Sequence, residues 1–174
     1  MPDGTVTRSF RVDESALKVI ESEAARQGLT VNTLVNHLLV KYARAERYLA
    51  KVGMLQVMDS ETIKDIFAKV PDAQLAEIGK KNGKALAFQN LVHAMTGGSS
   101  TQNIFQLLRT ICDLNAINYT EIEDSRKTTF TIVHNLNRQF SVFLANLISS
   151  ALDNAGTWPK TVLDDRIVTF EYEV

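Results

Sequence analysis

Polar and apolar side chains alternate at the start of the chain. One side of an extended backbone would carry three apolar residues and one exception, namely Val6, Arg8, Phe10 and Val12. The other side would carry Thr5, Thr7, Ser9 and Arg11. This period of two predicts a half-buried β-strand over residues 5–12. Because a lone strand leaves its backbone N–H and C=O groups unpaired, it needs a partner, and the next strand pattern begins only near residue 117.

Helical spacing replaces the alternation after Val12. Asp13 is a good N-cap, and Gly28 supplies the C-terminal stop of the first helix. A second helix begins at Thr30 or Asn32, and its apolar stripe continues to Gly53 with Leu34, Leu38, Tyr42, Ala45, Leu49 and Val52. One strand and two short helices cannot enclose a core alone. Pairing across a two-fold axis would supply both a partner for the strand and a shared core for the helices, because the strand then pairs antiparallel with its own copy.

The segment FRVDESALKVIESEAARQGLTVNTLVNHLLVKYARAE resembles the ribbon-helix-helix family of DNA-binding proteins, of the MetJ/Arc type, without gaps. The matching features are the alternating strand, the DES helix start, the apolar helix positions Leu17 and Ile20, the Gly28-Leu29-Thr30 turn and the second amphipathic helix. The resemblance is confined to residues 5–50, and no single residue is diagnostic. It implies an intertwined homodimer in residues 1–53.

The resemblance also implies that a two-stranded ribbon enters the major groove of double-stranded DNA. Arg11 suits bidentate binding to guanine, while Thr and Ser tolerate several bases. The start of the second helix offers N–H groups and a positive dipole end to a phosphate. The expected DNA contacts are Thr5, Thr7, Ser9, Arg11, Thr30 and Asn32.

Charge supports an anionic partner for the N-terminal part. The chain has a net charge of −1, yet residues 1–53 carry eight basic against six acidic residues, and the remainder carries eleven against fourteen. We expect a sequence-specific transcriptional regulator, in particular a repressor. Two alternatives stay open: a dimer that binds only a protein partner, and a sensor that binds DNA only when loaded with a metal or metabolite.

Residues 54–174 predict an α+β domain, helical over 54–115 and sheet-rich over 116–174. Strand patterns occur in INYTEIE, TTFTIVH, TVL and IVTFEYEV, and the strongest helix pattern is NRQFSVFLANLISSALDNAG. The order helix–strand–strand–helix–strand–strand favours two layers, with an antiparallel sheet on one side and helices on the other. This domain would add dimer or tetramer contacts and bind a small-molecule effector.

The stretch HNLNR is a candidate effector site, formed by His134, Asn135, Asn137 and Arg138. A strand ends and a helix begins there, and an anionic ligand can dock at a helix start. The alternative, which we favour, is that Asn135 or Asn137 simply caps the helix. Trp158 and Pro159 lie in a loop and could line a pocket or an interface.

The sequence predicts no enzyme, metal site or cofactor. His93, Cys112 and His134 match no zinc spacing, and we interpret Cys112 as a core residue. TGGSSTQ lacks the lysine of a phosphate-binding loop. A single cysteine and the absence of a signal-like N-terminus or a long apolar run favour a cytoplasmic protein without a membrane span.

Overall fold

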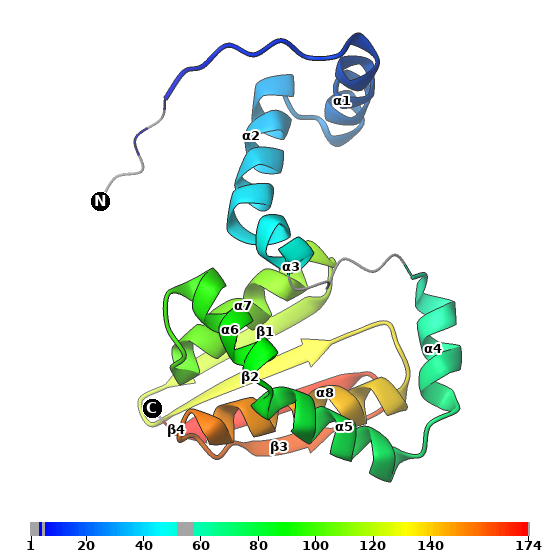
Figure 1. Ribbon diagram of the computed structural model, residues 1–174, viewed down its shortest axis with the longest axis vertical. Helices are drawn as coiled ribbons and strands as arrows, with labels where there is room; N and C mark the ends of the chain where they lie inside the picture. The colour runs from blue at the N-terminus through cyan, green and yellow to red at the C-terminus, as the bar shows by residue number, and fades with distance from the viewer. Residues whose placement is uncertain (1–3, 5, 52–57, 174) are drawn as a thin grey trace. The chain divides into compact units, whose positions relative to one another are not determined.

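The chain divides into two compact units. A computed structural model describes residues 4, 6–51 and 58–173 (Figure 1). The units are Met1–Ala43 and Arg44–Val174. The domain boundary that we predicted at Gly53 lies outside the described residues. The chain divides earlier because Tyr48 and Leu49 pack into the hydrophobic core of the second unit.

The first unit contains two capped helices, α1 (Glu14–Gln27) and α2 (Val31–Lys41). The Asp13 carboxylate accepts hydrogen bonds from the N–H groups of Ser15 and Ala16, at 2.9 and 3.2 Å. Gly28 ends α1 in the left-handed conformation, with φ 66°. Thr30 caps α2 by accepting from the N–H of Thr33. Of the two N-caps that the sequence left open for the second helix, the structure uses Thr30.

The N-terminal strand that we predicted over residues 5–12 is absent from this single chain. Thr5 lies outside the described residues, and residues 6–12 form neither helix nor strand (Figure 1). The side chains of Val6, Phe10 and Val12 are 69%, 72% and 54% exposed. A strand requires a ladder of hydrogen bonds to a neighbour, and no other described segment pairs with these residues. The ribbon of a ribbon-helix-helix fold is therefore not shown.

The second predicted helix is also interrupted. Its α-helical geometry ends at Lys41, a π-helical turn η1 (Tyr42–Glu46) follows, and α3 (Arg47–Lys51) resumes the α-helix. The segment predicted as one helix is thus helical from Val31 to Lys51 with a π-helical turn inside it, and its predicted end at Gly53 lies outside the described residues. The interruption falls where the chain passes from one compact unit to the other.

The second unit is an α+β domain, as the sequence predicts. Its helices are α4 (Ser60–Ala68), α5 (Asp72–Lys84), α6 (Leu86–Thr96), α7 (Thr101–Leu114) and α8 (Arg138–Asn154). Its strands are β1 (Asn118–Asp124), β2 (Lys127–Val133), β3 (Lys160–Leu163) and β4 (Ile167–Glu173). They form one antiparallel sheet in the order β1-β2-β4-β3.

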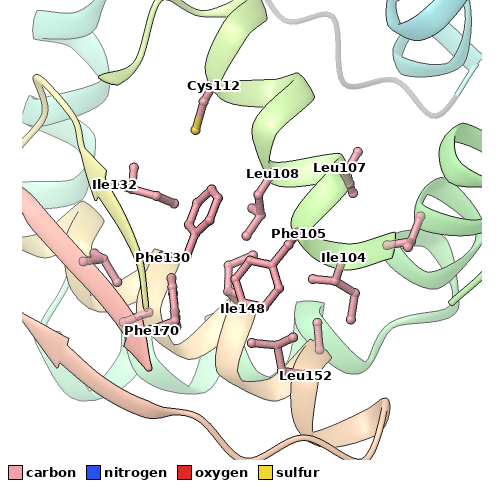
Figure 2. Close-up of a cluster of buried hydrophobic side chains, with 14 of the residues drawn as sticks. Ile104, Phe105, Leu107, Leu108, Cys112, Phe130, Ile132, Ile148, Leu152 and Phe170 are labelled. Atoms are coloured by element: carbon pink, nitrogen blue, oxygen red, sulfur yellow. The ribbon is translucent and has the colours of Figure 1, made fainter. Parts of the chain in front are cut away.

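The core lies between one face of the sheet and the helices α7 and α8. Figure 2 shows Phe130 and Phe170 of the central strands facing Phe105 of α7 and Ile148 of α8. The Phe105 ring lies 5.1 Å from that of Phe130 and stacks on Tyr172 at 4.7 Å, centroid to centroid. Residues on the opposite face, such as Thr129, Thr131 and Thr169, are only half-buried. The last strand follows the same division, with Val168 and Phe170 buried and Thr169 and Glu171 half-buried.

Helix α5 packs directly on the backbone of α8 through two glycines. A Cβ atom at Gly79 would lie 2.6 Å from the carbonyl oxygen of Phe143. A Cβ atom at Gly83 would lie 2.2 Å from the carbonyl oxygen of Leu147. Backbone atoms cannot give way as flexible side chains do, so both positions require glycine.

We predict that Gly79→Ala destabilises the protein by about 1–3 kcal/mol, the usual cost of overpacking. In an open helix the same change would stabilise by up to about 1 kcal/mol, because alanine has the higher helix propensity. Urea unfolding followed by circular dichroism measures the difference. Glu77→Ala, at an exposed position of α5, is the control and should stay within about 0.5 kcal/mol of the wild type. An increase in stability in Gly79→Ala would contradict the close packing.

Candidate nucleic-acid interface

The polar side of the N-terminal segment is fully accessible. Thr7, Ser9 and Arg11 are exposed, and so is Arg8, while Thr5 lies outside the described residues. Neither arginine makes an ion pair with another described residue. By contrast, the basic residues Lys18 and Arg26 of α1 pair with Glu14 and Glu23 on the same helix. The uncompensated positive charge of this region therefore precedes α1.

The two helix starts of the first unit differ in charge. The start of α1 carries Asp13 and Glu14, and the pKa of Asp13 is lowered by hydrogen bonds from the Ser15 hydroxyl and from backbone N–H groups. The first turn of α2 has no acidic residue. The dipole of α2 and the N–H groups of Val31 and Asn32 are thus available to a phosphate, while the N–H of Thr33 is taken by the Thr30 cap. The first N–H groups of α1 already face carboxylates.

Thr30 and Asn32 both lie at the start of α2 but play different parts. The Thr30 hydroxyl accepts the N–H of Thr33 at 3.1 Å and lies 2.8 Å from the Thr33 hydroxyl. Its side chain is thereby committed to capping the helix. Asn32 is exposed and has no hydrogen-bond partner among the described residues. Asn32 is the better candidate for a side-chain contact to an anion.

The first unit buries very little apolar surface. Among its described residues only Ala24 and Leu34 are buried. Eight large apolar side chains of its described residues remain exposed: Val6, Phe10, Val12, Val19, Leu38, Leu39, Val40 and Tyr42. This small helix pair leaves an incomplete core, which is the state expected of half an intertwined dimer.

Each of the four candidate effector residues, His134, Asn135, Asn137 and Arg138, contacts another part of the fold. His134 is 3% exposed, and its Nδ1 accepts the N–H of Leu136 at 3.2 Å. Its Nε2 therefore carries the proton and donates to the Ser141 hydroxyl at 2.8 Å. The Ser141 hydroxyl donates in turn to the carbonyl oxygen of Asp165 at 3.1 Å. This series of hydrogen bonds connects the start of α8 to the turn before β4.

The remaining polar residues of this stretch attach α4 and α5 to the start of α8. Asn137 caps α8 by accepting the N–H of Phe140, as the preferred interpretation predicted, and its amide donates to the carbonyl oxygen of Lys64 at 2.9 Å. Asn135 donates to the Ser60 hydroxyl at 3.4 Å. Arg138 lies 3.7 Å from the carboxylate of Asp72. These contacts give the segment a structural role, while Asn135 and Arg138 remain exposed and ligand binding there stays a prediction.

The described residues offer little other chemistry. Cys112 is buried in the core, as predicted, and burial raises its pKa to about 11. No group of three or more His, Cys, Asp or Glu side chains in the described part of the chain could hold a metal ion. None of the described helices has the length and apolar character needed to cross a membrane.

Comparison with known proteins gives no further identification: no family model matches the chain, and no curated protein matches it. Trp158 and Pro159, which the sequence suggested could line a pocket or an interface, both line a groove together with residues of α5 and α8. The sequence did not predict that the three lysines of GKKNGK line the same groove, because this depends on the packing of α5 on α8 through two glycines.

We predict that the protein loses stability as the pH falls below about 6.5, in part through His134. Burial lowers the pKa of His134 below its ordinary value of 6.5, so the unfolded chain binds a proton that the folded chain excludes. The contribution of His134 is therefore complete above pH 6.5 and declines below it. For a single proton the slope is at most about 1.4 kcal/mol per pH unit.

Urea unfolding at a series of pH values, on the wild type and His134→Gln, measures this effect. The glutamine variant should be less stable at neutral pH and should show a shallower decline in acid. His93→Gln, at an exposed position, is the control and should keep the wild-type slope. Equal slopes in the wild type and His134→Gln would contradict the assignment of a buried, neutral imidazole.

Proposed function

We propose that this protein is a homodimeric, sequence-specific DNA-binding regulator, and that its N-terminal unit forms the DNA-binding surface. One observation carries the proposal: exposed apolar and exposed polar side chains alternate in the segment immediately before α1, in a unit that lacks a completed core. The resemblance of this segment to the ribbon-helix-helix family supports the same function.

Pairing with a second copy accounts for the alternation. Two antiparallel copies of residues 5–12 would satisfy each other's backbone groups and turn Val6, Phe10 and Val12 toward the four helices. Each large apolar side chain that becomes fully buried contributes about 1.5–3 kcal/mol. The apolar residues of α2 that the single chain exposes, Leu38, Leu39 and Val40, would complete the shared core.

The opposite side of such a ribbon suits the major groove. Arg11 supplies a guanidinium that can donate two hydrogen bonds to a guanine, and Thr7 and Ser9 supply short hydroxyls. The start of α2, with its free N–H groups and Asn32, would hold a phosphate and fix the register on the duplex. Because one ribbon reads only a few base pairs, dimers joined through the second unit would bind more tightly than isolated ones.

We predict that Arg11→Ala weakens binding to a selected DNA site by about fivefold to a hundredfold, the range for loss of a base-reading arginine. The site is first selected from a random duplex library with the full-length protein. Fluorescence anisotropy over a salt series then gives affinity and salt dependence for each variant. Lys18→Ala is the matched control, because Lys18 is already paired with Glu14 at 2.7 Å, and it should bind like the wild type.

Two outcomes would contradict the proposal. If no duplex is enriched and none binds at low salt, with or without added metal, the N-terminal unit only dimerises and the activity lies with a protein partner. If Arg11→Ala and Lys18→Ala bind alike, the segment does not read bases. Binding that appears only with a metal or metabolite would support the sensor form of the regulator.

We predict further that Phe10→Ser shifts the protein from dimer toward monomer. Phe10 is 72% exposed in the single chain, so the variant removes apolar surface that only a second copy would bury. Sedimentation equilibrium should show a dimer dissociation constant raised at least about tenfold. Ser9→Ala, its neighbour on the polar side, should leave the dimer unchanged. A wild-type protein that is monomeric at high micromolar concentration would refute the shared core.

A further inference from the structure

A groove lies between α5 and α8, beside the loop that joins α8 to β3. It has a volume of about 660 Å³. Its lining includes Lys80, Lys81 and Lys84 of α5, Ser149 and Asp153 of α8, and Trp158 of the loop. This volume falls within the range of about 300–1,000 Å³ that is usual for small-molecule sites.

The groove is positively charged in a chain whose net charge is −1. Three lysines face a single carboxylate, that of Asp153, which lies 2.9 Å from the Nζ atom of Lys84. Lys80 and Lys81 are exposed and have no ion pair with another described residue. The charge that remains unpaired favours an anionic ligand.

Trp158 is 77% exposed, although its polar atom is already satisfied. The indole N–H donates to the Asp153 carboxylate at 2.6 Å, which fixes the plane of the ring. Neighbouring contacts hold the loop: the N–H of Thr157 donates to the carbonyl oxygen of Leu152 at 2.9 Å, and its hydroxyl lies 2.6 Å from that of Thr101. A large apolar ring is thus held in place with its face open to solvent.

A fixed aromatic face next to unpaired lysines fits a ligand that combines a flat ring with an anionic group. Aromatic side chains stack on nucleobases, and lysine ammonium groups bind phosphate. Trp158 also lines a second hollow, together with Arg126, Lys127 and Lys160, but the lining of that hollow includes Glu171 and Glu173 as well. Lys127 pairs there with Glu171 at 3.1 Å, so the groove lined by Lys80, Lys81 and Lys84 is the more cationic of the two.

We propose that this groove binds a nucleotide, with the base stacked on Trp158 and the phosphates held by Lys80 and Lys81. The serine hydroxyls nearby are engaged in the fold: Ser150 donates to the carbonyl oxygen of Lys80, and Ser149 lies 2.8 Å from the hydroxyl of Thr161. Recognition therefore comes from the ring and the ammonium groups. The site is independent of the proposed DNA-binding surface and gives the second unit a ligand of its own.

The test uses the intrinsic fluorescence of the full-length protein, because Trp158 is the only tryptophan in the chain. Titration with adenosine diphosphate should quench the emission saturably. Adenosine alone and inorganic phosphate alone should each bind at least about tenfold more weakly, since each lacks one of the two contacts. For variants that lack the tryptophan, calorimetry measures the affinity for the same ligands.

Two variants and one control locate the site. Lys80→Ala combined with Lys81→Ala, and separately Trp158→Leu, should each weaken adenosine diphosphate binding at least about tenfold. Lys160→Ala removes a cation from the second hollow that the same tryptophan lines and should leave the affinity unchanged. Circular dichroism checks that each variant is folded.

The proposal is overturned if adenosine diphosphate does not bind, or if phosphate alone binds as tightly, which would make the groove a simple anion site. It is also overturned if affinity for single-stranded oligonucleotides rises steeply with length while the mononucleotide does not bind, because the ligand would then be a nucleic acid. Loss of binding in Lys160→Ala but not in the Lys80 and Lys81 variant would place the ligand in the other hollow.

Discussion

The burial of helix α8 on two sides is the constraint on which the second unit depends. One side of α8 contributes Ile148 and Leu152 to the core against the sheet. On the opposite side, the α8 backbone packs against Gly79 and Gly83 of α5. Asn137, which caps α8, also donates to the carbonyl oxygen of Lys64 in the middle of α4. The strands, the outer helices and the lysine groove therefore take their positions from a single helix.

The two units of the chain differ in how completely they bury their apolar side chains. The second unit encloses a core of aromatic and aliphatic side chains around Phe105, and its sheet satisfies the backbone groups of the strands. The first unit leaves most of its large apolar residues exposed and gives residues 6–12 no strand to pair with. A chain that is complete in one unit and incomplete in the other is suited to associate through the incomplete one, which is the physical basis of the proposed dimer.

The stretch around His134 shows that polar residues at a helix start can hold elements of a fold together. A ligand site and a set of caps require the same residue types, because both depend on unpaired N–H groups at the start of a helix. In this protein the side chains of residues 134–138 connect α8 to α4, to α5 and to the turn before β4. The exposed Trp158 contrasts with them, since the hydrogen bond of its indole leaves the ring face free.

The sequence by itself determined the helices and strands of the second unit, because local periodicity and capping residues such as Asn137 act within a few positions of the chain. It also determined the antiparallel α+β class and the two sides of the last strand, since alternation follows directly from strand geometry. Tertiary structure alone decided that Tyr48 and Leu49 belong to the second core, and that His134 is buried and neutral. It alone placed three lysines and Trp158 in the lining of one groove, because this arrangement depends on two glycines that let helices distant in sequence approach each other.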